Sequence, residues 1–123
     1  MDGTDLRRDL GRSGEQAAAE HLQRLGFEVL ERNYRTRWGE LDLVAYDGST
    51  LVFCEVKARR SGSGAPFDAL GAGKQRQVRR LAMRWLTERP DRPRAADLRF
   101  DAIGVSVDSN GRLVAVEHLE GAF

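Results

Sequence analysis

Hydrophobic residues recur at helical spacing in two parts of the chain and follow strand-like patterns in five others. The first helix is expected to start at Ser13, because a Ser followed three residues later by Gln16 has capping-box spacing. It is expected to end at Gly26, as a C-cap glycine would end it. The second helix is expected over residues 73–88. Its buried face would comprise Val78, Leu81, Ala82, Trp85 and Leu86.

Strand patterns cover residues 27–34, 41–46, 51–58, 98–107 and 113–119. The dipeptide Asp47-Gly48 predicts a turn between the second and third strands, and Asn110-Gly111 predicts a hairpin between the last two. The third strand is apolar on both faces, so we expect it to be central and covered on both sides. The order of elements therefore indicates an α/β domain with a mixed sheet.

Composition narrows the class of protein. The chain has 123 residues with 41% hydrophobic and 32% charged residues, which suits one domain over residues 1–123 with a loosely ordered segment at 1–12. A single cysteine, Cys54, excludes an internal disulfide and is expected to be a small core residue. No apolar run approaches a membrane span and residues 1–15 lack a secretory signal, so we expect a cytoplasmic protein without membrane contact.

Charged residues interrupt the buried hairpin, and these are the first candidates for chemistry. Glu40 and Asp42 lie on one strand, and Glu55 and Lys57 lie on the next. Buried ionised groups are costly, so they usually neutralise, pair or hold a metal. If the strands pair through the turn, Asp42 comes close to Glu55, and one carboxyl group takes up a proton unless a cation lies between them.

All-oxygen ligation with few donors suits Mg²⁺ or Mn²⁺. Strand alternation points Glu55 and Lys57 the same way, roughly 6.5–7 Å apart. Lys57 beside such a metal would orient or help deprotonate an attacking water and stabilise developing negative charge. This set is suited to phosphodiester hydrolysis, and the alternative is a structural cluster of ion pairs.

An Asp on one strand, Glu-x-Lys on the next and then a helix resemble the PD-(D/E)XK nuclease superfamily. The uncharacterised bacterial YraN family, which is similar to Holliday-junction resolvases and RecB-like nucleases, is matched more closely by residues 14–60, GEQAAAEHLQRLGFEVLERNYRTRWGELDLVAYDGSTLVFCEVKARR. KQRQVRRLAMRWL and LRFDAIGV extend the match over nearly the whole chain. The resemblance implies a restriction-endonuclease-like single domain, with a mixed central sheet of about five strands flanked by helices.

The resemblance also implies roles for individual residues. Asp42 would be the central metal ligand, Glu55 the second ligand and Lys57 the catalytic lysine. Glu15 matches a helical glutamate that completes the metal site in the resolvase-like branch, and Gln75 matches a polar position that often faces the substrate backbone. For Glu15 an equal alternative is a favourable interaction with the helix dipole in a first turn.

Arginine provides 18 of the 20 basic residues, and its planar fork matches phosphate geometry. Arg76, Arg80 and Arg84 form one stripe on the second helix by their spacing of four residues. A solvated helical face is the usual explanation, but only Glu88 offers a nearby acidic partner, so contact with nucleic acid is favoured. The set predicted to contact DNA is Lys74, Gln75, Arg76, Arg80, Arg59, Arg60 and Arg37.

Several other residues have two interpretations. Glu40 is expected to pair with Arg35 or Arg37 rather than bind metal. Trp38 is expected to pack at a strand start, with stacking on a base as the alternative. Structural roles are expected for Asp101, His21 and His118.

The leading hypothesis is a Mg²⁺-dependent endonuclease-like protein acting on DNA, branched or single-stranded. The alternatives are an inactive nucleic-acid-binding module and a scaffold whose arginines face an acidic protein. A two-fold dimer would present two sites, and Trp85, Phe67 and the apolar C-terminus are the candidates for its interface. Residues 59–73 are expected to form a mobile loop that closes over DNA.

Overall fold

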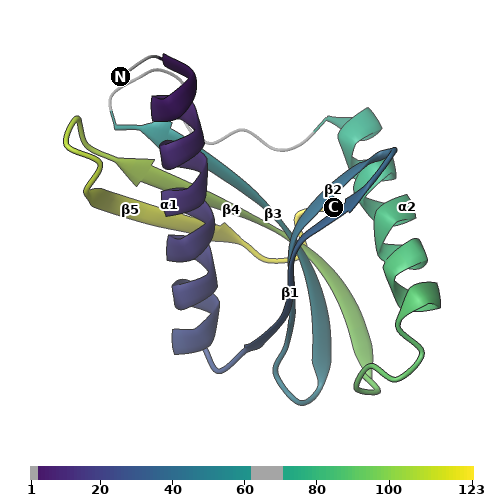
Figure 1. Cartoon of the computed structure of the whole chain (residues 1–123). Coiled ribbons are helices and arrows are strands. Elements are labelled where there is room, and N and C mark those ends of the chain that lie inside the picture. Colours follow the sequence, from purple (N-terminus) through teal and green to yellow (C-terminus); the bar gives the residue numbers. More distant parts are fainter. Residues whose placement is uncertain (1–2, 62–70) are drawn as a thin grey trace.

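The structure is a computed structural model that describes residues 3–61 and 71–123, with side chains from residue 13 onward. Its elements follow the expected order of one helix, three strands, one helix and two strands (Figure 1). They are α1 (Gly3–Arg24), β1 (Glu28–Thr36), β2 (Gly39–Tyr46), β3 (Thr50–Arg60), α2 (Ala72–Glu88), β4 (Asp97–Val107) and β5 (Leu113–Leu119).

Within the described residues, five strands form one mixed sheet in the order β1-β2-β3-β4-β5. All neighbours are antiparallel except β3 and β4, which are parallel because α2 forms the crossover between them. The prediction that the third strand is central is confirmed. The predicted α/β class, with a mixed five-stranded sheet flanked by helices, is also confirmed.

The sheet carries a hydrophobic core on each face. Val52 and Cys54 of β3 point into a cluster with α1, whereas Leu51 and Phe53 point into a cluster with α2. Strand alternation alone explains this division, because successive side chains leave a strand on opposite faces. The two helices therefore cover opposite faces of the sheet, and Cys54 is a buried core residue as expected.

Helix α1 begins at Gly3, ten residues before the predicted start, so the capping-box interpretation of Ser13 is wrong. Its C-terminal end is as predicted. Gly26 adopts φ +96°, its N–H bonds the Gln23 carbonyl at 3.0 Å, and the Phe27 N–H bonds the Leu22 carbonyl at 2.9 Å. These two bonds form a Schellman motif, which requires a left-handed residue and therefore favours glycine.

Trp85 does not have the interface role suggested for it. Its side chain is 2% exposed and lies in the core beneath α2, where its ring packs edge-on against Phe53. The C-terminal Phe123 packs against Phe100. Phe67, the third candidate for an interface, lies outside the described residues. None of the helices within the described ranges is long and apolar enough to span a membrane.

Strand β2 changes face at Asp42. Leu41 belongs to the core cluster on the α2 face and Leu43 to the cluster on the α1 face, although residues two apart on a regular strand share a face. Asn33, whose neighbours Arg32 and Tyr34 pair with Leu43 and Leu41 on the adjacent strand, has φ +53°. The distortion brings Asp42 to the point where the two layers of the core meet.

Candidate active site

Asp42 lies where strands β2 and β3 separate. The last pair in their register is Leu43 with Cys54, so the next residues on β3 have no backbone partner on β2. The Asp42 side chain replaces that partner, because its Oδ2 accepts a hydrogen bond of 2.7 Å from the Val56 N–H. The carboxylate is thereby fixed to the backbone of the strand that carries Glu55 and Lys57.

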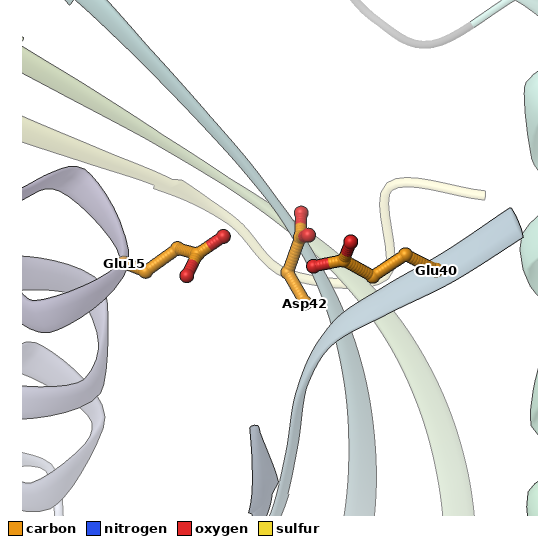
Figure 2. Close-up of side chains that lie close together, drawn as sticks. All are labelled: Glu15, Glu40 and Asp42. Carbon is orange, nitrogen blue, oxygen red and sulfur yellow. The ribbon is translucent and has the colours of Figure 1, made fainter. Parts of the chain in front are cut away.

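Three carboxylates from two distant parts of the chain meet at this point. Glu15 of α1, with Glu40 and Asp42 of β2, each place one oxygen so that the three atoms lie within 4.8 Å of one another. Figure 2 shows Glu15 reaching from the helix toward Asp42, with Glu40 on the other side. Glu15 lies in the middle of α1, so its alternative interpretation as a first-turn residue is wrong.

The electrostatics of the cluster favour protonation. Burial, followed by the nearby charge of Glu55, raises the pKa of Asp42 to about 7, against the hydrogen bond from Val56. Burial also raises the pKa of Glu15, while a hydrogen bond from Asn33 opposes the shift. Carboxyl groups with raised pKa values in one cluster hold a proton or a cation, as the sequence predicted for this hairpin.

Glu55 is buried, with 8% of its surface exposed, and it faces two different environments. Its Oε1 lies 3.2 Å from the Nζ of Lys74 at the start of α2, whereas its Oε2 has no hydrogen-bond partner among the described residues. Burial raises the pKa of Glu55 and the Lys74 ammonium works against that shift. A buried carboxylate oxygen without a partner is costly and is therefore a candidate ligand atom.

Lys57 is exposed near the end of β3. Its positive charge lowers the pKa of Glu55, as expected for two groups that follow each other on one face of a strand. In the sheet register it lies opposite Gly104 of β4, a residue without a side chain. Lys57 is thus an exposed cation near the carboxylate site, whereas Lys74 is the cation that forms an ion pair with Glu55.

The donor set fits a small divalent cation. Ligand oxygens around octahedral Mg²⁺ are about 3–4 Å apart, so a small adjustment of the side chains of Glu15, Glu40 and Asp42 would bring them into range. The Oε2 of Glu55, which accepts no hydrogen bond from the described part of the chain, offers a further oxygen. Hard carboxylate oxygens are the ligands that Mg²⁺ and Mn²⁺ prefer.

Glu40 has the predicted ion pair and also lies close to the other carboxylates. Its Oε2 lies 3.2 Å from the Nε of Arg35, which is the pairing expected from the sequence. It is also a member of the carboxylate cluster. The spacing of two residues between Glu40 and Asp42 predicts a shared face, so a signal for its inclusion was present in the sequence, although β2 is irregular at Asp42.

A groove of about 810 Å³ runs along α2 beside this site. Its walls are formed by Trp38, Gly73, Lys74, Arg76, Gln77, Arg80, Leu81 and Arg84. Most of these residues follow helical spacing on one side of α2, so the predicted basic stripe is a single surface.

Ion pairs neutralise two of the cations on this side of α2. Lys74 pairs with Glu55, and Arg84 donates a hydrogen bond of 3.0 Å to Glu88 within the helix. The guanidinium of Arg79 lies 4.6 Å from the centroid of the Phe100 ring. Within the part of the chain that the structure describes, no acidic side chain forms an ion pair with Arg76 or Arg80. The cationic character of the groove therefore rests mainly on these two arginines.

Gln77, which the sequence argument overlooked, connects α2 to the turn between β1 and β2. Its Nε2 donates a hydrogen bond to the carbonyl of Trp38. The adjacent Gly39 has φ +142°, and a Cβ there would lie 2.5 Å from Gln77 Nε2. Gln75, the glutamine singled out by the resemblance, does not line the groove. Helical spacing from Lys74, Leu81 and Arg84 would have favoured Gln77.

Trp38 was expected to pack at a strand start, but the structure leaves it exposed. Its ring is 52% exposed and carries the guanidinium groups of Arg37 and Arg84 at 4.4 and 4.9 Å from its centroid. Arg59 and Arg60 continue strand β3, pairing with Ser106 and Val107, rather than starting a loop. The rest of that expected loop falls mainly on residues 62–70, outside the described ranges.

Asp101 and the two histidines form a separate, structural cluster. Asp101 is fully buried and accepts hydrogen bonds from Arg99 at 2.8 Å and from the Gly121 N–H at 2.9 Å. His118 Nε2 lies 2.7 Å from Asp101 Oδ2, and His21 Nε2 lies 3.0 Å from His118 Nδ1. The expected structural role of all three residues agrees with these contacts.

The chain belongs to the uncharacterised protein family UPF0102, because the family model matches residues 14–105. That range contains Glu15, Glu40, Asp42, Glu55 and Lys57. The family resembles the PD-(D/E)XK nuclease-like superfamily.

Full-length relatives agree with this assignment. The chain is 52% identical to a UPF0102 protein of Frankia casuarinae over 93% of this chain and 95% of that one. It is 48% identical to a UPF0102 protein of Chlorobium chlorochromatii, over 94% of this chain and 91% of the relative. It is 44% identical to a UPF0102 protein of Geobacter metallireducens, over 94% of this chain and 93% of the relative. The names of these relatives state a family and no activity.

Proposed function

We propose that this protein is a metal-dependent endonuclease that hydrolyses phosphodiester bonds in DNA. The observation that carries the proposal is the meeting of Glu15, Glu40 and Asp42 within 4.8 Å beside the buried Glu55. Carboxylates with raised pKa values are costly to gather, and a structural role would be met by fewer of them. The groove with Arg76 and Arg80 supplies a surface for the phosphate backbone.

Asp42, Glu15 and the free oxygen of Glu55 would hold Mg²⁺ or Mn²⁺, with Glu40 as a further ligand. Such an ion, when bound, polarises a phosphodiester and lowers the pKa of a coordinated water. The exposed ammonium of Lys57 would orient the attacking water, and its charge would stabilise negative charge that develops on the phosphate. Arg76 and Arg80 would hold the flanking phosphates in place.

The test is cleavage of labelled linear, single-stranded and branched DNA with Mg²⁺ or Mn²⁺. We expect cleavage by the unmodified protein, and a loss of about 100-fold or more in Asp42→Ala and Lys57→Ala. Asp97→Ala, which removes an exposed carboxylate at the start of β4, is the matched control and should retain full activity. Absence of cutting on every substrate, or equal cutting by Asp42→Ala, would contradict the proposal.

A nucleic-acid-binding module without cleavage is the second candidate. It is favoured by the ion pairs of Glu55 with Lys74 and of Glu40 with Arg35, because these contacts neutralise part of the site without a metal. Under this alternative, salt-dependent DNA binding survives in Asp42→Ala and Glu55→Gln. Calorimetry would then detect no Mg²⁺ binding at millimolar concentration.

A further inference from the structure

Trp38 is an exposed aromatic residue on the wall of the α2 groove. It lies in the turn between β1 and β2 and lines both the α2 groove and a second cavity of about 460 Å³. Trp85, by contrast, is 2% exposed and donates its indole N–H to Glu31 at 3.0 Å. A large aromatic side chain that stays 52% exposed between two cavities has not been placed there by core packing.

The backbone that carries Trp38 is held firmly. Its carbonyl accepts the hydrogen bond from Gln77, and its N–H donates to Thr36 Oγ1 at 3.0 Å. Gly39 follows directly, and its φ of +142° is a conformation that residues with a side chain rarely adopt. The ring is therefore presented from a fixed turn, which reduces the entropy lost when a ligand binds it.

The surroundings of the ring are cationic. The exposed Arg37 and the Glu88-paired Arg84 lie over it, and Arg76 and Arg80 line the groove that it borders. A basic groove that also offers an aromatic face is the arrangement by which proteins bind single-stranded nucleic acid. Bases in a continuous duplex stack on one another and present only their edges, so they cannot use such a face.

We propose that Trp38 stacks on an unpaired base, so that the DNA recognised by this protein contains a single-stranded segment. The base replaces the exposed Arg37 guanidinium on the ring, and Arg37 then contacts a phosphate. The cleavage of this strand rests on the proposed nuclease function, whereas the stacking itself does not.

The position of Trp38 relative to the carboxylates predicts how far from the stacked base the DNA strand is cut. Trp38 precedes Asp42 by four residues, so their Cα atoms are separated by at most about 14 Å. The scissile phosphate is therefore expected within a few nucleotides of the stacked base. A cut mapped to within a few nucleotides of a single-strand boundary would agree with this spacing.

The test is binding without divalent metal, so that cleavage plays no part. A labelled 20-nucleotide single strand and the duplex of the same sequence are titrated with the unmodified protein, Trp38→Ala, Trp38→Phe and the control Leu98→Ala. Leu98 is 49% exposed on β4 and lines neither cavity. We expect Trp38→Ala to weaken single-strand binding about tenfold and duplex binding less than about twofold, while Trp38→Phe retains most of the affinity and Leu98→Ala is unchanged.

Equal losses on both DNAs, no loss, or no single-strand binding by the unmodified protein would overturn the inference. Competition by polyglutamate that depends on Trp38 as strongly as DNA binding does would also overturn it, in favour of an acidic protein partner. Failure of the nuclease proposal looks different, because selective single-strand binding would persist while no DNA is cut. If DNA is cut and Trp38→Ala binds a single strand normally, only the stacking inference fails.

Discussion

At the residue scale, the ionised side chain of Asp42 lowers the free energy of unfolding, because it is buried beside other carboxylates. Its carboxylate is held by one backbone N–H, while burial and Glu55 raise its pKa to about 7. Because the folded state binds this proton more tightly than the unfolded chain does, the carboxyl group favours folding less as pH rises from about 4 to above 7. Metal binding would reverse that loss by compensating the charge.

The Asp42→Asn variant tests this energetic statement. The amide keeps an oxygen for the Val56 N–H and removes the charge, so we expect the free energy of unfolding at pH 8 without metal to rise by about 1–3 kcal/mol. Urea denaturation measures this change, and Asp97→Asn, with an exposed carboxylate, should have no effect. Added Mg²⁺ should stabilise the unmodified protein but not Asp42→Asn. A lower stability of Asp42→Asn at pH 8 would contradict the interpretation.

At the element scale, the close approach of helix α1 to strand β3 brings Glu15 to the site. Gly14 faces Ala58, and a Cβ at position 14 would lie 2.5 Å from the Ala58 Cβ and 3.9 Å from the Val105 Cβ. Real Cβ atoms do not come that close, so any side chain at position 14 moves the helix away from the sheet. The next residue, Glu15, would move with it.

Gly14→Ala should therefore destabilise the protein by about 1–3 kcal/mol, although alanine is the better helix former. Gly73→Ala is the matched control in α2, where the nearest atom to an added Cβ is Arg76 NH2 at 3.9 Å. That change should be neutral or stabilise by up to about 1 kcal/mol.

A compensating substitution gives the sharper result. Ala58→Gly removes the opposing methyl group, so it should restore part of the stability and the Mg²⁺ response of Gly14→Ala. Thermal unfolding with and without Mg²⁺ measures both effects. Gly14→Ala and Gly73→Ala behaving alike would mean that the helix does not depend on this close approach.

At the scale of the whole molecule, a hydrogen-bonded chain ties α1 to the far side of the sheet. His21 on α1 contacts His118 on β5, which contacts Asp101 on β4. With Asp101 ionised, His118 donates to it from Nε2. Burial, His118 and Arg24 all lower the pKa of His21, while hydrogen bonds from His118 and Arg99 lower that of Asp101 against burial.

The lowered pKa of His21 predicts a pH dependence of stability. The unfolded chain takes up this proton near pH 6.5 while the folded chain resists it, so this contribution to stability is lost as pH falls below about 6.5. His21→Gln, which keeps a donor for His118, should show a loss between pH 7.5 and 5 that is smaller by about 0.5–1 kcal/mol. Urea denaturation at the two pH values measures the difference. Parallel pH profiles for the two proteins would contradict the prediction.

Asp101 contributes in a separate window. Its lowered pKa means that its contribution is present above about pH 3.8 and is lost on further acidification. Asp42 and Glu55 titrate in the opposite sense, since burial raises their pKa values. Comparing His21→Gln with the unmodified protein cancels these shared contributions.

The sequence by itself determined the order of helices and strands and the neighbouring positions of Asp42, Glu55 and Lys57. Alternation along β2 and β3 and the turn between them are local, so they predicted that Asp42 approaches Glu55 with Lys57 beyond it. The same patterns predicted the central position of β3 and the glycine that ends α1. Local signals failed at Ser13, where capping-box spacing occurs inside a longer helix. They also failed at Trp38, which is exposed, and at Arg59 and Arg60, which continue β3 instead of starting a loop.

Only the tertiary structure decided which distant groups complete the site. Glu15 reaches the site because α1 packs closely at Gly14, and Lys74 meets Glu55 because the first turn of α2 lies beside β3. The backbone of Trp38 is held by the hydrogen bond from Gln77. These contacts join residues far apart in sequence, and their distances depend on how helices pack on a twisted sheet, which residue spacing does not specify.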